Sequence, residues 1–366
     1  MTHQRLPRNG PEREALRERG QFWTPPWVAE AMVAYAVGAR DSVTIFDPAV
    51  GAGAFFFAAK AIAHESGKRL KLAGTEIDPT TLVHALTSGL SHDDLKDVQI
   101  ADFILAPSER KFDAIVGNPP YIRHHRLSKE TKAKLRSLAL QTVRASLDGR
   151  AGLHVYFLIR ALTLLEPQGR LSFIMPADTC EGVFAHRLWY WIVSKYQLDA
   201  VVTFAADASP FPGVDTNPVI VMINNEMPQQ TFLWVRCLEQ NTPELKRWVN
   251  SGFSPEGFSS LSVTRREIGE GLATGFSRPR PSSSENSIAL GDLARVMRGI
   301  ATGANDYFLI TPERARELEI PEEYLCPAIA RTRDVTESEI TEDTMRRLKD
   351  SGRPTLLVQN QRSKVE

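Results

Sequence analysis

Strand-like and helix-like segments alternate along the first two thirds of the chain, and this alternation limits the fold more than any other feature. Helices are expected from Pro26, with Thr24 as the capping residue, and at 54–64, 79–90, 153–165 and 184–195. Buried strands are expected between them at 43–46, 70–76, 98–101, 112–116, 170–175, 198–204 and 219–223. Such alternation predicts an α/β fold with a mostly parallel seven-stranded sheet covered by helices on both faces.

The length of 366 residues exceeds that of a usual single domain. Ser, Gly and Pro cluster at 275–284, and Arg265, Arg266, Arg278 and Arg280 lie nearby, which is typical of a linker. The predicted organisation is a flexible N-terminal segment (1–20), a first domain (21–245), a linker (246–287) and part of a second domain (288–366).

Composition excludes several classes of protein. Lys+Arg and Asp+Glu are 44 each, so net charge by itself indicates no nucleic-acid partner. Cys180, Cys237 and Cys326 are far apart, which argues against a zinc site and a disulfide framework, and no metal site is expected. The chain has no run near the roughly 20 apolar residues of a membrane span, and its start does not resemble a signal peptide. We expect a soluble cytoplasmic protein without a membrane partner.

A glycine turn follows the first expected strand, where 47–53 reads Asp-Pro-Ala-Val-Gly-Ala-Gly and opens a helix. Glycines let the backbone approach a ligand, and a helix N-terminus offers amide donors, although a purely structural turn is the alternative. Glu76 ends the second strand, where a carboxylate can accept ribose hydroxyls. Two glycines, rather than the three that serve a pyrophosphate, favour an adenosine-containing cofactor without phosphate. Asp102 and Phe103 end the third strand and are candidates for the adenine amino group and ring face, although Asp102 taken singly is typical of a turn.

The most specific pattern is Asn118-Pro119-Pro120-Tyr121, which follows the fourth strand. Two prolines fix the backbone and remove two amide donors, so the carbonyls of the turn stay available as acceptors. The side-chain oxygen of Asn118 and the carbonyl of Pro119 are candidate acceptors for an exocyclic amine. Stacking of a base on Tyr121 contributes about 1–3 kcal/mol, comparable to the cost of flipping a base out of the duplex. The alternative is a Pro-rich turn with a packed tyrosine.

A basic segment follows this tetrapeptide, with eight Lys or Arg against two acidic residues between 122 and 150. Arg123, Arg126 and Lys129 are the candidates for contacts with the DNA backbone, which are independent of sequence and sensitive to salt. A solvated helix face is the alternative.

Taken in order, 24–26, 46–55, 75–79, 101–103 and 118–121 resemble the motifs of gamma-type adenine-specific DNA methyltransferases of bacterial restriction-modification systems. This resemblance implies a class I S-adenosylmethionine-dependent methyltransferase fold, Rossmann-like, followed by a target recognition domain. It implies methyl transfer from S-adenosyl-L-methionine to the amino group of a flipped adenine in double-stranded DNA, directly and without a covalent enzyme intermediate.

The resemblance also assigns residues. Those implied to contact the cofactor are Thr24, Asp47, Ala49, Gly51, Gly53, Glu76, Asp102, Phe103, Asn118 and Phe157. Asn118, Pro119 and Tyr121 would hold the adenine, with Phe211 as a second stacking aromatic. Residues 298–305 resemble the opening of a target recognition domain, and the chain ends soon after. We therefore expect that this domain is truncated or that another polypeptide, such as a specificity partner or a restriction endonuclease, completes the system.

Other functions stay open. A methyltransferase acting on another planar amide or amine, in protein glutamine or RNA, shares a similar tetrapeptide, but residues 250–366 favour DNA. A catalytically silent DNA-binding subunit of a defence complex is a second alternative. A nucleotide-dependent dehydrogenase gives no reason for the Asn118–Tyr121 sequence.

Overall fold

The computed structural model describes residues 23–106, 110–147, 149–211, 217–279, 293–295, 305–331, 334–335 and 339–359. The chain divides into two compact units, Met1–Pro281 and Ser282–Glu366. The expected flexible segment at 1–20 lies outside the described residues. In the described part of the chain, no helix is long and apolar enough to cross a membrane.

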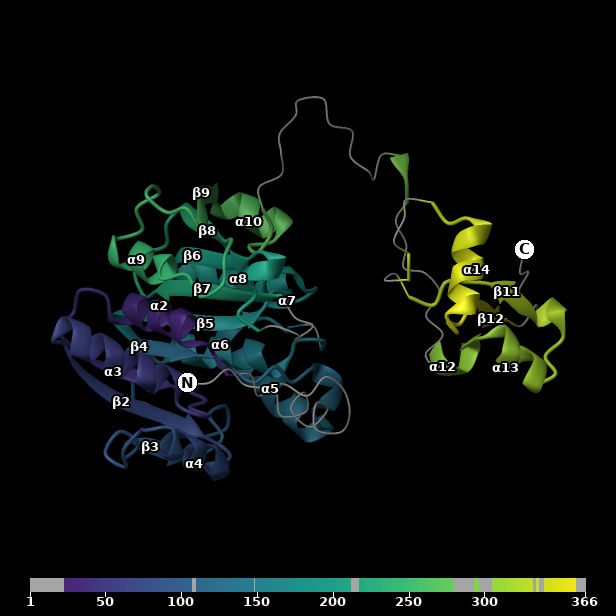
Figure 1. Cartoon of the computed structure of the whole chain (residues 1–366). Helices are drawn as coiled ribbons and strands as arrows, with labels where there is room; N and C mark the ends of the chain where they lie inside the picture. Colours follow the sequence, from purple (N-terminus) through teal and green to yellow (C-terminus); the bar gives the residue numbers. More distant parts are fainter. Residues whose placement is uncertain are drawn as a thin grey trace. The chain divides into compact units, whose positions relative to one another are not determined.

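A mixed sheet forms the centre of the first unit and has nine strands among the described residues, in the order β3-β2-β1-β4-β5-β7-β6-β8-β9 (Figure 1). Their bounds are β1 (Ser42–Asp47), β2 (Arg69–Glu76), β3 (Val98–Ile100), β4 (Phe112–Gly117), β5 (Leu165–Pro176), β6 (Gln197–Phe204), β7 (Pro218–Asn224), β8 (Thr231–Cys237) and β9 (Leu261–Glu267). The five strands from β3 to β5 in this order (β3, β2, β1, β4 and β5) pair in parallel with their neighbours. β7 is antiparallel to β5 and β6, and β9 is antiparallel to β8. The predicted class I α/β fold is confirmed, but with nine strands instead of seven.

The two additional strands lie beyond the last one that the sequence predicts, and one of them lies in the expected linker at 246–287. That segment holds most of α9 (Glu244–Asn250), then β9 and α10 (Ile268–Thr274). Trp248 of α9 is fully buried, and so is Arg266 of β9, which pairs with Glu270 at 3.1 Å. Two of the arginines that suggest a linker, Arg265 and Arg266, therefore lie in a polar strand at the edge of the sheet.

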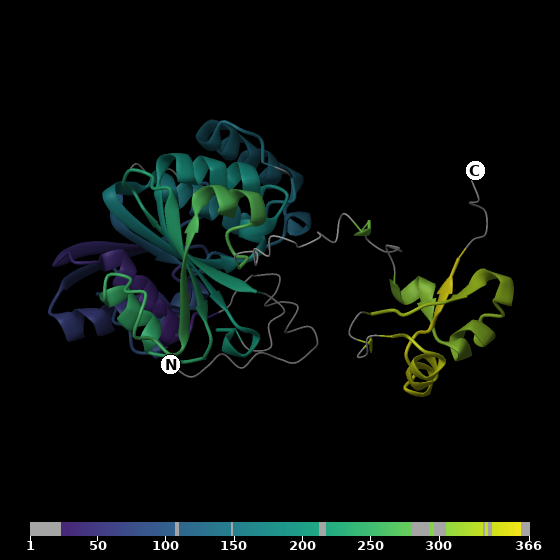
Figure 2. The same ribbon diagram turned by 90° about the horizontal axis from the view of Figure 1, so that it is seen from above.

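Helices cover both faces of the sheet. On one face lie α2 (Pro26–Val37), α3 (Ala54–Ser66) and α9, and on the other α5 (Lys129–Val143), α6 (Leu153–Thr163), α8 (Ala185–Lys195) and α10. Figure 2 shows α2 in purple and α9 in green on one side of the sheet and the blue-green α5 and α6 on the other. Successive strand residues alternate between the two cores, as Val221 and Met222 of β7 do.

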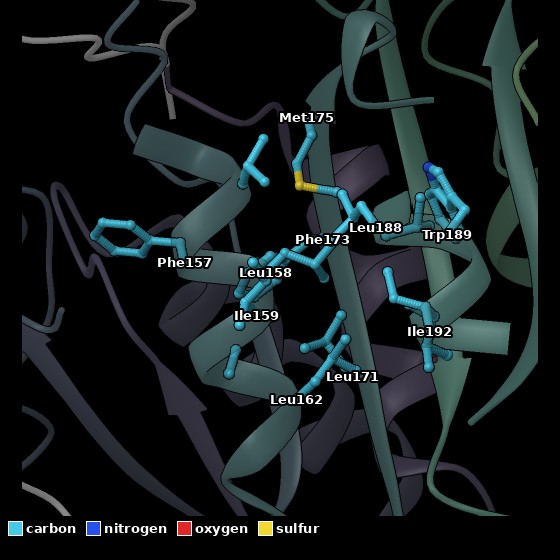
Figure 3. Close-up of a cluster of buried hydrophobic side chains, with 14 of the residues drawn as sticks. Phe157, Leu158, Ile159, Leu162, Leu171, Phe173, Met175, Leu188, Trp189 and Ile192 are labelled. Carbon is cyan, nitrogen blue, oxygen red and sulfur yellow. The ribbon is translucent and has the colours of Figure 1, made fainter. Parts of the chain in front are cut away.

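The core between β5, α6 and α8 fixes α6 in place (Figure 3). Leu158, Ile159, Phe173 and Leu188 are fully buried there. Burial of a side chain of this size stabilises the fold by about 1.5–3 kcal/mol. This packing positions α6, whose first residue, Leu153, donates its amide to the Ile122 carbonyl just after the tetrapeptide.

The second unit has a small antiparallel sheet of its own, in the order β10-β12-β11. Its strands are β10 (Leu309–Ile310), β11 (Leu325–Pro327) and β12 (Leu356–Val358), and its helices include α12 (Asn305–Phe308), α13 (Pro312–Glu317) and α14 (Glu342–Asp350). Its buried apolar side chains include Ile310, Ala315 and Leu357. Of the segment expected to open a target recognition domain, 298–304 lies outside the described residues.

Candidate active site

The candidate site lies at the carboxyl ends of the parallel strands. β1 and β4 are neighbours in the sheet, and the connection from β1 runs to β2 on one side while the connection from β4 runs to β5 on the other. Ligands of open α/β sheets bind at such a switch point. A cavity of about 460 Å³ opens there, within the usual range for small-molecule sites.

The structure brings together most of the predicted cofactor residues around this cavity. Those that line it are Thr24, Ala49, Gly51, Glu76, Asp102, Phe103, Asn118 and Phe157. The predicted cofactor residues Asp47 and Gly53, and the predicted base contacts Pro119, Tyr121 and Phe211, do not line it. The cavity therefore combines most of the predicted cofactor residues with Asn118, and the other predicted base contacts do not line it.

Glu76 ties the glycine turn to the end of β2. Its Oε2 atom accepts a hydrogen bond from the Gly51 amide at 2.7 Å, and its Oε1 atom accepts from the Ile77 and Asp78 amides, both at 2.9 Å. A carboxylate offers about four lone-pair positions. Three are used, so Oε2 can accept one ribose hydroxyl in this arrangement, and a second requires the Gly51 amide to release its bond.

Gly53 is required by the geometry of the turn. Its φ is 82°, in the left-handed region, and a Cβ atom there would lie 2.6 Å from Leu90 Cδ1. Gly53 is the residue before the first turn of α3, so its role is to let the turn enter the helix. This explains why Gly53 shapes the cavity without lining it.

Asp47 lies beneath the turn instead of in the cavity. It is fully buried, its Oδ1 accepts from the Ala49 amide at 2.9 Å, and its Oδ2 has no hydrogen-bond partner in the described structure. Burial raises the pKa of the Asp47 carboxyl to about 8. In this structure Asp47 therefore shapes the turn that lines the cavity, and a direct cofactor contact stays a prediction.

The Asp47 carboxyl makes the stability of the protein depend on pH. Its pKa is raised on folding, so its stabilising contribution is fully present below about pH 4 and is lost as the pH rises to about 8. Asn cannot ionise, so the Tm of Asp47→Asn should fall less between pH 5 and 8 than the Tm of the unsubstituted protein. The two decreases in Tm should differ by about 5 °C or more. Thermal unfolding across this pH range checks this, and parallel curves for the two proteins would contradict it.

The aromatic wall of the cavity comes from the segment after β3 and from α6. Phe103 is 5.1 Å from Phe157 between ring centroids and 5.8 Å from Phe46. Figure 3 shows Phe157 turned outward from α6, away from Leu171 and Ile192. Next to this wall the Asp102 Oδ1 atom accepts from the Ile104 amide at 2.9 Å. A planar group in the cavity thus meets aromatic surface beside a carboxylate.

Thr24 does not cap α2, contrary to its predicted role. The capping position is Pro25, and no side chain caps the helix. The Thr24 hydroxyl instead accepts a hydrogen bond from Asn118 Nδ2 at 3.2 Å. This bond orients the Asn118 amide so that its oxygen faces away from Thr24, and a contact between residues 94 positions apart cannot be recognised from local sequence.

Tyr121 does not line the cavity, although its neighbours Pro120 and Ile122 do. Its hydroxyl donates to the Ile174 carbonyl at 3.2 Å, and its ring meets His154 edge-on. Burial raises the pKa of Tyr121 well above its usual value, so the hydroxyl stays a donor at neutral pH. Phe211 is 5% exposed and packs in the core on the α2 side of the sheet.

The predicted DNA-backbone residues surround the start of α5. Arg123, Arg126 and Lys129 are exposed, and Ser128 caps α5 by accepting from the Thr131 amide at 3.0 Å. Thr131 and Leu135 of the same helix line the cavity. Lys129 therefore lies on the helix that borders the candidate site, and Arg123 and Arg126 lie in the segment just before this helix.

Several lining residues were not predicted, among them Trp23, Ile77, Thr80, His84 and Leu153. Ile77 has a signal in the sequence, since it directly follows Glu76, and in the structure its side chain is 68% exposed. Leu153 precedes Phe157 by four residues and so shares its helix face.

Comparisons with known proteins place the chain in a family. Residues 12–245 match the family described as N-6 DNA Methylase, well over half of the sequence. The chain belongs to this N-6 DNA methylase family. Residues 280–366 match the family described as the C-terminal domain of the type II methyltransferase M.Eco57I. The resemblance to gamma-type amino-methyltransferases of restriction-modification systems is thereby confirmed.

The relatives of this chain include two type II methyltransferases. M.AccI of Acinetobacter calcoaceticus is 25% identical over 96% of this chain, and M.XamI of Xanthomonas campestris pv. amaranthicola is 26% identical over 87%. The matches span 64% and 58% of those proteins, so the chain corresponds to about three fifths of their length.

Solved structures agree on the fold. The methyltransferase subunit of a type I restriction-modification system from Streptococcus thermophilus superposes with a TM-score of 0.56 at 16% identity, over 69% of this chain and 57% of that one. The type IIG restriction endonuclease BpuSI gives 0.57 at 18% identity, over 94% of this chain and 44% of that one. At such identities the likeness establishes the class I methyltransferase fold of this chain and no more.

Proposed function

We propose that this chain transfers a methyl group from S-adenosyl-L-methionine to the exocyclic amino group of a flipped adenine in double-stranded DNA, as the methyltransferase of a restriction-modification system in the cytoplasm. The observation that carries the proposal is that Asn118, the first residue of the tetrapeptide, lines the same cavity as Glu76 and Asp102. Residues suited to an amine acceptor and to an adenosine donor thus share one space.

The residues around the cavity fit S-adenosylmethionine. Glu76 has one acceptor position left on Oε2 for a ribose hydroxyl, Asp102 supplies a carboxylate, and Phe103 supplies aromatic surface for the adenine. The Gly51 amide already donates a hydrogen bond to Glu76, so the glycine turn does not offer this amide to a pyrophosphate. When bound, the cofactor supplies an electrophilic methyl group on a sulfonium.

The chain's own contribution to the reaction is to hold and polarise the amine. The lone pair of an exocyclic adenine nitrogen is delocalised into the ring, which makes it a weak nucleophile. Acceptors placed on its two hydrogens, the Asn118 side-chain oxygen and the Pro119 carbonyl, favour a pyramidal and more reactive amine. Thr24 fixes the Asn118 amide for this task, and Tyr121 and Phe211 are proposed to stack on the base.

Removing the basic side chains at the start of α5 should weaken DNA binding. For the triple variant Arg123→Ala/Arg126→Ala/Lys129→Ala, the slope of log K against log salt should decrease by about 2–3, because each lost phosphate contact removes about 0.9. The Kd for S-adenosylmethionine should stay within about two-fold, since these side chains do not line the cavity.

A matched control uses three exposed cations at the opposite ends of the strands, Arg69→Ala/Lys71→Ala/Lys111→Ala. Duplex binding titrated over a range of salt concentrations is the measurement. Equal slopes for the two triple variants would exclude the start of α5 as a DNA contact.

Transfer of labelled methyl groups tests the function. The purified chain is incubated with methyl-labelled S-adenosylmethionine and unmethylated duplex DNA, RNA or protein. Label in duplex DNA alone supports the proposal, label in RNA or protein supports another planar amine or amide, and cofactor and DNA binding without any transfer supports a silent DNA-binding subunit. A further partner, such as a specificity subunit or an endonuclease, is proposed to complete the restriction-modification system.

A further inference from the structure

His154 is a buried histidine beside the tetrapeptide that no part of the proposed reaction uses. It is the second residue of α6 and is 4% exposed, and neither of its ring nitrogens has a hydrogen-bond partner in the described structure. A neutral imidazole carries one N–H donor and one acceptor. Leaving such groups buried and unpaired costs about 1–3 kcal/mol, so the position has a reason other than stability.

The imidazole lies between Tyr121 and Asp178. The ring centroids of His154 and Tyr121 are 6.1 Å apart with an interplanar angle of 73°, an edge-on contact. His154 Nε2 is 3.6 Å from Asp178 Oδ1. Asp178 begins α7 (Asp178–Glu181), two residues after the end of β5, whose Ile174 carbonyl accepts a hydrogen bond from the Tyr121 hydroxyl. Tyr121 is thus held at its hydroxyl by β5 and at its ring by His154.

The first turn of α6 is docked on the tetrapeptide. The Leu153 amide donates to the carbonyl of Ile122, the residue after Tyr121, at 2.9 Å. A Cβ atom on Gly152 would lie 2.7 Å from His154 Cε1 and 3.1 Å from the Ile122 carbonyl oxygen. Gly152 therefore leaves the space that the imidazole occupies next to the corner.

This turn has two working faces. Leu153 and Phe157, four residues apart, line the cofactor cavity. His154 is one residue further along, about 100° around the helix, and contacts Tyr121 instead. A change at His154 should therefore alter the Tyr121 side of the corner and leave the cofactor side intact.

We propose that His154 and Asp178 are positioning residues for Tyr121, with the imidazole holding the Tyr121 ring and the Asp178 carboxylate orienting the imidazole. This inference rests on the proposed function, in which Tyr121 stacks on the target base. A carboxylate that receives an imidazole N–H fixes the orientation of the ring in many sites, and such contacts are often long before the substrate is bound.

Kinetics of the variants provide the first test. His154→Phe keeps a ring of similar size without nitrogens, and Asp178→Ala removes the carboxylate. Each should lower kcat for methyl transfer to DNA by about 10-fold, with the Kd for S-adenosylmethionine within about two-fold. Asp178→Asn keeps an acceptor oxygen and should retain most of the rate. In the double variant His154→Phe/Asp178→Ala, kcat should be little lower than in either single variant, because the two residues act together.

The matched control is His186→Ala, since His186 is an exposed histidine on α8, and it should leave both quantities unchanged. Wild-type rates in His154→Phe and Asp178→Ala would overturn the proposal. So would equal losses of cofactor affinity and rate, because they would indicate a merely structural role.

A second readout does not depend on turnover. The chain has seven tyrosines, and labelling with 3-fluorotyrosine gives each a ¹⁹F resonance, with that of Tyr121 assigned by its loss in Tyr121→Phe. It should be single and sharp in the unsubstituted protein and broadened or doubled in His154→Phe and Asp178→Ala. An unchanged line in both variants would overturn the positioning role. Failure of the proposed function would appear separately, as absence of transfer by the unsubstituted protein.

Discussion

Asn118→Ala is expected to lower the rate of methyl transfer by about 10²–10³-fold, the loss typical of removing one oriented hydrogen-bond partner from a developing charge. The Asn118 amide is oriented by the Thr24 hydroxyl at 3.2 Å. Its loss removes the side-chain acceptor for the amine, while Glu76, Asp102 and Phe103 still line the cavity. The Kd for S-adenosylmethionine should therefore change by less than about five-fold.

Thr24→Val serves as the matched control for Asn118→Ala. It keeps the size of the side chain at a position that is 3% exposed and removes only the acceptor for Asn118 Nδ2. An intermediate loss of rate is expected, since Asn118 is still present but no longer oriented. Single-turnover transfer and calorimetric cofactor titration separate chemistry from binding. Full activity in Asn118→Ala would remove Asn118 from the reaction.

Glu76→Ala, unlike Asn118→Ala, is expected to act mainly on cofactor binding, with the Kd for S-adenosylmethionine raised about 10²-fold. A hydrogen bond to a charged group contributes about 1.5–3 kcal/mol, and the turn is also released when the Gly51, Ile77 and Asp78 amides lose their common acceptor. Because three bonds end on Glu76, the Tm should fall as well.

Glu76→Gln separates these two effects. The glutamine keeps one acceptor oxygen, so most of the turn is preserved while the negative charge is lost, and a smaller rise in Kd is expected. Glu65→Ala is the control, since Glu65 is an exposed glutamate on α3 that does not line the cavity. Cofactor titration and thermal unfolding are the measurements, and unchanged affinity in Glu76→Ala would show that the cofactor binds elsewhere.

The part of the site that sequence predicts best is the part fixed by chain order. Glu76 ends one parallel strand, Asp102 and Asn118 follow two others, and the ends of such strands meet at one edge of the sheet. Their proximity therefore follows from the alternation of strands and helices. The cavity-lining position of Ala49 and Gly51 follows for the same reason.

The rest depends on contacts between distant residues. Thr24 next to Pro25 and Pro26 has the pattern of a cap, but its partner is Asn118. Strand β9 is polar because it lies at a sheet edge. Arg266 is buried in this strand because it pairs with Glu270 and donates a hydrogen bond to Thr274, and no pattern in the sequence indicates these contacts. His154, in an apolar helix, has no local signal for its contact with Tyr121.

Identification of the methylated nucleoside is the most direct test of whether the Asn118 corner holds an adenine amino group next to the cofactor cavity. The chain and its Asn118→Ala variant are expressed at equal levels in a host without DNA methyltransferases of its own, and the DNA is digested and analysed by mass spectrometry. N6-methyldeoxyadenosine should be present with the unsubstituted chain and absent with the variant. Equal amounts with both proteins, or methylation of another nucleoside only, would contradict this account.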